Sequence, residues 1–119
     1  MTESGLEKRL RYALACSRIV WRKKLYKRHF AQIVSDRGQH VITLPEGYDS
    51  DYLLRTLIHE LAHVALPGEL DAFGVLQEDV IERVIEPRMM DYILRHPKKQ
   101  QWWLRYVTKE GTGGRQATN

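Results

Sequence analysis

The chain has 119 residues, with 19 lysines and arginines against 15 aspartates and glutamates and a formal net charge of +4 at pH 7. This length allows one domain with a real core, and no apolar run approaches the roughly 18 residues of a membrane-spanning helix. The single cysteine excludes an internal disulfide. Because the first residues also lack the apolar stretch of a signal peptide, we expect a cytoplasmic protein.

Charge is distributed unevenly along the chain. Residues 1–40 contain ten lysines and arginines against three acids, and residues 92–119 contain six against one. Residues 41–91 contain eleven acids and only three arginines. An acidic block suits a bound divalent cation. The basic ends are either a solvated face or a contact for nucleic acid, and charge alone does not decide between them.

The first half of the chain predicts one helix and a hairpin. Apolar residues recur at helical spacing over residues 3–26, which indicates one long amphipathic helix with a basic outer face. Two β-rich runs, 29–35 and 40–44, flank the turn-forming residues 36–39. A turn with glycine between such runs is typical of an antiparallel β-hairpin. The fold class expected is therefore α+β.

The second half predicts helices separated by prolines. A helix over about residues 51–66 should end at Pro67, and a second apolar-periodic helix should run from about Gln77 to His96. Pro87 lies inside this second pattern and should kink or divide it. We expect a single domain over residues 1–108, with Trp102 and Trp103 in a short docking segment. Residues 109–119 have the composition of a disordered tail.

One motif in the first of these helices indicates a chemistry. His59, Glu60 and His63 form the pattern H-E-x-x-H, and residues i and i+4 of a helix share a face. The two imidazoles can therefore converge on one metal ion, while Glu60 lies about 100° around the helix, within reach of a metal-bound water. Zinc hydrolysis needs this combination of nitrogen ligands, a carboxylate base and an open position.

Two other interpretations of the motif stay open. Each histidine could bond a backbone carbonyl while Glu60 pairs with an arginine, although an otherwise uncharged, buried helix makes three separate partners less economical than one metal. A structural zinc is the other alternative. Structural sites are usually closed and rich in cysteine, and this chain has only Cys16.

The third ligand should come from the acids that follow Pro67. Glu78 and Glu82 are spaced i, i+4 on the second helix and would face the same way. We favour Glu82 as the metal ligand, with Glu78 orienting a ligating histidine through its second ring nitrogen. Glu78 itself and Asp71 are the alternative ligands.

Residues 29–96 resemble a minimal zincin of the gluzincin kind, similar to small single-domain phage and prokaryotic metallopeptidases that include the minigluzincins. The resemblance rests on a hairpin, the H-E-x-x-H helix, a stop and a helix that bears glutamates. It implies that His59 and His63 bind zinc, that Glu60 is the general base and that a downstream glutamate completes the site. It also implies that a strand, either 31–35 or 41–44, pairs with an extended substrate.

The chain departs from that family in two respects. The stretch between His63 and Glu82 is compact, and only Tyr92 and His96 stand, by position, as candidates for the family's transition-state-stabilising residue. Residues 68–74 also resemble the aspzincin pattern with a spacing one residue short, which would make Asp71 the ligand.

The function expected is that of a zinc metalloendopeptidase, a hydrolase acting on few protein or peptide substrates inside the cell. Two alternatives come from other classes. One is a nucleic-acid-associated protease similar to SprT-like proteins, in which Trp102 and Trp103 would stack on single strands. The other is a binding protein that keeps the zincin shape without turnover.

Overall fold

The computed structural model describes residues 1–23, 32–36 and 39–108. The start of the first β-rich run and the expected tail at 109–119 lie outside these ranges. The elements of the described part, in chain order, are α1 (Glu3–Ala15), β1 (Ser17–Arg22), β2 (Gln32–Asp36), β3 (Gln39–Pro45), α2 (Ser50–Ala65), α3 (Pro67–Asp71), the 3₁₀ turn η1 (Gly74–Leu76), α4 (Gln77–Val80), the π-helical segment η2 (Ile81–Ile85), α5 (Glu86–Leu94) and α6 (Pro97–Leu104).

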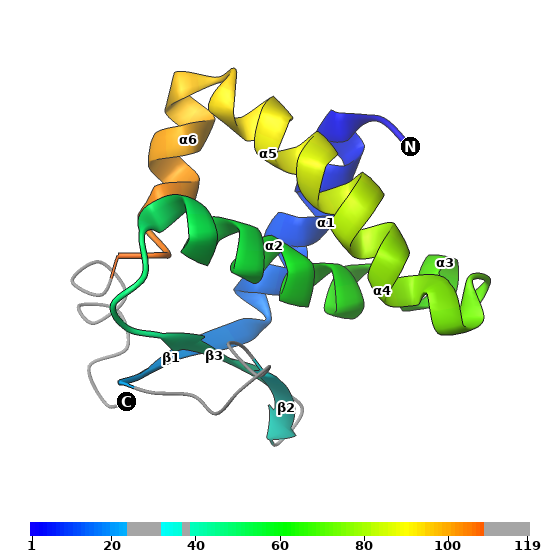
Figure 1. Ribbon diagram of the computed structural model, residues 1–119, viewed down its shortest axis with the longest axis horizontal. Coiled ribbons are helices and arrows are strands. Elements are labelled where there is room, and N and C mark those ends of the chain that lie inside the picture. The colour runs from blue at the N-terminus through cyan, green and yellow to red at the C-terminus, as the bar shows by residue number, and fades with distance from the viewer. Residues whose placement is uncertain (24–31, 37–38, 109–119) are drawn as a thin grey trace.

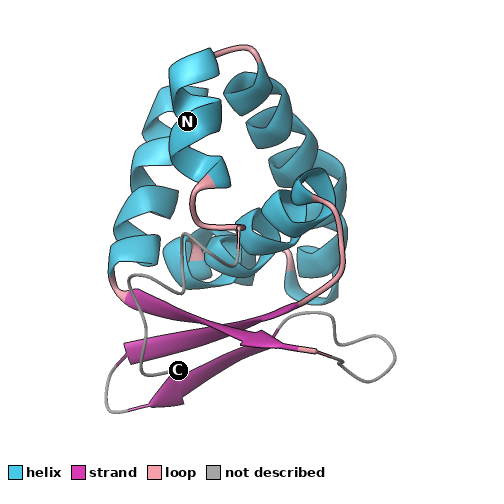
Figure 2. Ribbon diagram, turned by 90° about the vertical axis from the view of Figure 1, so that its left-hand side faces the viewer, coloured by secondary structure: helices cyan, strands magenta, loops and turns pink. Residues whose placement is uncertain are grey.

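The helices lie on one face of a three-stranded sheet, as Figures 1 and 2 show. The strand order is β1-β3-β2, with β3 in the centre. β1 runs parallel to β3 and places Ile19 opposite Ile42, whereas β2 runs antiparallel to β3 and places Ile33 opposite the same residue. The expected combination of helices with a small sheet is confirmed at this level.

The sheet and the first helix differ from the sequence-based prediction. The helix expected over residues 3–26 ends at Ala15, and residues 17–22 form β1 instead. Within β1 the β-branched Ile19 is buried and pairs with Ile42 of β3, and β-branched residues favour a strand over a helix. Because β1 adds a parallel pair, the sheet is mixed and is not the simple antiparallel hairpin that we expected.

The helix that carries H-E-x-x-H is the centre of the core. α2 agrees with the predicted helix at 51–66, and the Asp49 side chain caps it by accepting a hydrogen bond of 2.8 Å from the backbone N–H of Tyr52. α1, β3, η2, α5 and α6 all contact α2. Its core-facing residues have no exposed surface, and complete burial contributes roughly 1.5–3 kcal/mol for each such side chain; they are Leu54, Leu57, Ile58 and Leu61.

The C-terminal end of α2 is held by α1. The Arg9 guanidinium donates a hydrogen bond of 2.7 Å from Nη2 to the backbone carbonyl of Ala65 and forms an ion pair with Glu69 in α3. A cation at this position satisfies a carbonyl that has no partner within the helix and interacts favourably with the helix dipole. The Arg9 side chain therefore holds the end of the helix near His63 through two contacts, one with the Ala65 carbonyl and one with Glu69.

The second predicted helix continues past Pro87 without a break. Pro87 has no N–H, and in a regular helix its ring would collide with the carbonyl of Arg83. The structure accommodates it with the π-helical segment η2 directly before α5. A π turn contains about one residue more than an α turn, so it changes which residues share a face.

The expected docking segment is the helix α6, which closes the core. Trp103 is fully buried, and its indole N–H donates a hydrogen bond of 2.9 Å to Oε2 of Glu7 in α1. Lys99 donates to the other oxygen of the same buried carboxylate, also at 2.9 Å. The two tryptophans thus do not form an exposed pair on which bases could stack. In the part of the chain that the structure describes, no helix has the length and apolarity needed to cross a membrane.

Candidate metal centre

Two histidines and one glutamate converge where α4 passes over α2. Oε2 of Glu78 lies 2.8 Å from Nε2 of His59, and Oε1 lies 2.6 Å from Nε2 of His63. The spacing i, i+4 on α2 brings both imidazoles to one face, with ring centroids 5.3 Å apart. The ligand atoms of these three side chains all lie within 4.8 Å of one another. Two imidazole nitrogens and a carboxylate are a donor set that suits zinc.

The structure places the other candidate ligands elsewhere. Glu82, our expected third ligand, is exposed on η2 and is not part of the group of three. Asp71 is exposed at the end of α3 and is also outside it. Glu78 lies in the first turn of α4, where we expected only a supporting acid. The geometry therefore favours the alternative, Glu78.

A further glutamate, Glu86, supports this group, and the sequence analysis missed it. Its Oε2 lies 2.6 Å from Nδ1 of His59, and its side chain is only 9% exposed. In a regular α-helix, residues 78 and 86 differ by eight positions and point about 80° apart. The π segment between them absorbs about one residue, which leaves them within about 20° of each other. The only sequence signal was an acid within the apolar pattern of this helix.

Glu86 determines which nitrogen of His59 is available to a metal. When the imidazole is neutral, Nδ1–H donates to the Glu86 carboxylate, and the lone pair therefore lies on Nε2. Nε2 is the atom that faces Glu78 and His63. A carboxylate behind a ligating histidine is the usual way in which proteins orient such a ligand.

The site carries more negative charge than its histidines offset. Burial raises the pKa of Glu60, and the neighbouring His59 and His63 only partly oppose this effect. Burial also lowers the pKa of His59, but the hydrogen bond to Glu86 and the charges of Glu78, Glu86 and Glu60 outweigh it and raise that pKa to about 9. Without a metal, a proton on His59 therefore reduces the excess negative charge, and a divalent cation would do the same.

The two positional candidates for stabilising a transition state lie away from this group. Tyr92 packs against His96, with ring centroids 4.6 Å apart, and the Lys99 ammonium lies 5.6 Å from the centroid of its ring. The imidazole of His96 lies 2.6 Å from the Tyr92 backbone carbonyl at the end of α5. Neither residue is brought to the imidazoles of α2.

Comparisons with protein-family models, with curated proteins and with solved structures find no match to this chain. The functional interpretation therefore depends on the site itself. Its essential features are a ligand-like group of three side chains, an orienting carboxylate and a half-buried glutamate, Glu60, between the two histidines of α2.

In metal-free protein, stability should decrease as the pH rises from 6.5 to about 9. The pKa of His59 is about 9 when folded and about 6.5 when unfolded, so the folded state binds the extra proton across this window. The free energy of unfolding should drop by as much as about 3 kcal/mol. Urea unfolding at several pH values in the presence of a chelator measures this decrease in the free energy of unfolding.

Glu86→Gln removes a carboxylate that holds the proton, so this variant should show a much shallower decrease. His96→Gln, which changes a histidine outside the group, is the matched control and should keep the wild-type slope. A wild-type free energy of unfolding that is constant across this window would contradict the assignment of charges.

Proposed function

We propose that this protein is a zinc-dependent metallopeptidase that hydrolyses peptide bonds. The observation that carries the proposal is the convergence of His59, His63 and Glu78 on one point, beside Glu60. Two nitrogens and one oxygen leave a fourth position open, as in catalytic rather than structural zinc sites. The resemblance to gluzincins supports the same assignment and the cofactor, Zn²⁺.

Each residue of the site has a distinct role in the proposed reaction. His59, His63 and Glu78 hold the ion, and Glu86 keeps His59 in the tautomer that can bind it. The zinc ion, when bound, supplies a Lewis acid that lowers the pKa of water and polarises the scissile carbonyl. Glu60 accepts the proton of the attacking water and delivers it to the leaving amine. Its raised pKa suits a group that must both take and give a proton.

The sheet offers one of the two expected strands to an extended substrate. Residues 41–44 belong to β3, which is paired on both sides and has no free edge. β2 (residues 32–36) is paired with β3 alone and so ends the sheet among the described strands. We therefore propose that a peptide substrate adds to β2 through main-chain hydrogen bonds.

The ligand assignment predicts an order of zinc affinities. Glu78→Ala should weaken binding most, because it removes a ligand. Glu86→Ala should cost about 10–100-fold, the usual effect of losing an orienting partner. Glu82→Ala and Asp71→Ala should cost little. Competition with a chelating dye measures all four, and a loss for Glu82→Ala as large as that for Glu78→Ala would refute the assignment.

The catalytic proposal is tested by Glu60→Gln, which preserves size and removes the base. The variant should keep about one zinc per chain and lose peptide hydrolysis by about 10²–10⁴-fold. Glu82→Gln, an exposed acid outside the group, is the matched control and should keep activity. If Glu60→Gln loses the metal, Glu60 is a ligand or structural support. Wild-type protein that holds zinc and cleaves no peptide in a diverse library would instead be a binding protein.

A further inference from the structure

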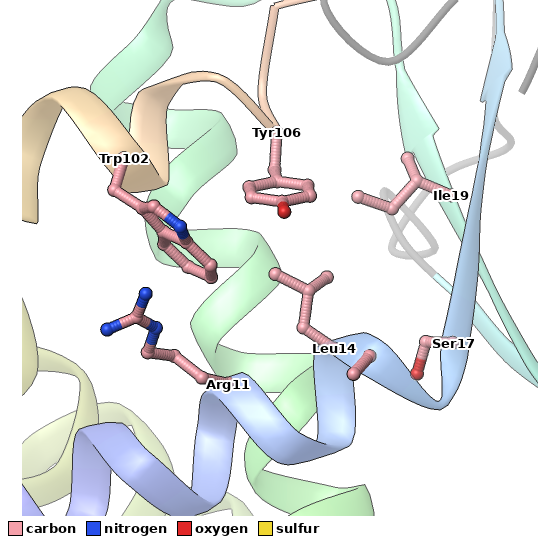
Figure 3. A pocket seen from close by; sticks show the side chains of 7 residues that line it. Arg11, Leu14, Ser17, Ile19, Trp102 and Tyr106 are labelled. Atoms are coloured by element: carbon pink, nitrogen blue, oxygen red, sulfur yellow. The ribbon is translucent and has the colours of Figure 1, made fainter. Parts of the chain in front are cut away.

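A second site lies between α1, β1 and α6, built from residues that take no part in the candidate metal centre. Figure 3 shows a pocket with a volume of about 290 Å³. The side chains of Arg11 and Trp102 lie together on one side, and those of Ser17 and Ile19 lie on the other. This volume is at the lower limit of small-molecule sites, which suits a group the size of one amino-acid residue.

Arg11 gives this pocket a positive charge without a counter-charge. Its guanidinium carbon lies 3.9 Å from the centroid of the Trp102 ring, so the indole holds the cation against its face. Among the residues that the structure describes, Arg11 has no hydrogen bond or ion pair beyond this contact. None of the described residues that line the pocket is an aspartate or glutamate. The N–H groups of Arg11 are therefore available to an anion.

The rest of the pocket is suited to an apolar group. Leu14 and Ile19, which are 6% and 1% exposed, line it. The rings of Trp102 and Tyr106 contact each other at a centroid distance of 4.9 Å and form an aromatic wall. The Ser17 hydroxyl donates a hydrogen bond of 2.7 Å to the backbone carbonyl of Ala13.

We propose that this pocket binds a carboxylate carried next to an apolar side chain. The planar guanidinium matches the two oxygens of a carboxylate, and its single positive charge matches the single negative charge. A phosphate dianion would find one cation, Arg11, among the described residues of this lining. Two sources share the proposed chemistry: the C-terminal residue of a polypeptide, and a free small acid of the same kind.

The test uses N-acetyl-leucine as the probe and the full chain as the protein. Nuclear magnetic resonance should show saturable shifts of the Trp102 indole N–H signal, assigned by its loss in Trp102→Phe. N-acetyl-leucinamide, which lacks the carboxylate, should bind at least about tenfold more weakly, because a hydrogen bond to a charged group is worth about 1.5–3 kcal/mol. Equal binding of the acid and the amide would overturn the proposal, as would the absence of saturation.

Substitutions separate the role of Arg11 from general charge. Arg11→Gln should weaken the acid about tenfold or more and leave the amide unchanged, and Arg11→Lys should be intermediate because it keeps the charge without the two-pronged geometry. Arg105→Gln removes a nearby arginine that does not line the pocket and should have no effect. If Arg11→Gln binds the acid as the wild type does, the proposal is wrong.

A longer peptide distinguishes the two sources. A peptide that ends in leucine with a free carboxylate should bind more tightly than N-acetyl-leucine if polypeptide C-termini are the ligand. Equal affinity of the peptide and N-acetyl-leucine shows that a free small acid is a sufficient ligand. Both results support the proposal that the pocket binds a carboxylate next to an apolar side chain. None of these measurements depends on zinc or hydrolysis, so they succeed or fail independently of the proposed peptidase activity.

Discussion

The burial of α2 is the constraint on which the rest of the structure depends. Four of its large apolar residues have no exposed surface, and the sheet and five helical segments contact it. Its polar residues lie on the face left outside this core, and α4 crosses the C-terminal part of α2, as Figure 1 shows. His59, Glu60 and His63 are half-buried residues of this C-terminal part. Glu78 and Glu86, on the passing segment, are the groups that meet the two imidazoles there.

The sequence predicts those elements whose determining residues lie close together in the chain, and it misses those that depend on distant partners. α2 was predicted within a residue at each end because an Asp cap, an apolar face and Pro67 all act within a few residues. β1 was missed because Val20 and Trp21 continue the helical spacing of Leu10 and Leu14. The pairing of Ile19 with Ile42, which makes this segment a strand, joins residues that are distant in the chain. Partners far apart in sequence leave no local trace, so the parallel pair could not be anticipated.

The sequence predicted the two histidines of the candidate site, but not which acids lie beside them. His59 and His63 follow from i, i+4 geometry, which any α-helix provides. The choice between Glu78 and Glu82 and the role of Glu86 depend on η2, where Pro87 prevents the regular hydrogen-bond pattern. A helical wheel without that segment places Glu86 about 80° away from Glu78. The π segment thus connects Pro87 in the sequence to the alignment of two carboxylates, Glu78 in α4 and Glu86 in α5, that contact the histidines of α2.

The most direct test of this account is zinc K-edge X-ray absorption spectroscopy on the zinc-loaded protein. The account predicts nitrogen and oxygen neighbours only, two of them imidazoles at about 2.0–2.1 Å, with the scattering pattern of both rings. Replacing Glu78 by alanine should remove one protein oxygen and leave both imidazoles. A sulfur neighbour at about 2.3 Å, the distance of a cysteine thiolate such as that of Cys16, would contradict the account. Fewer than two imidazoles in the wild type would contradict it as well.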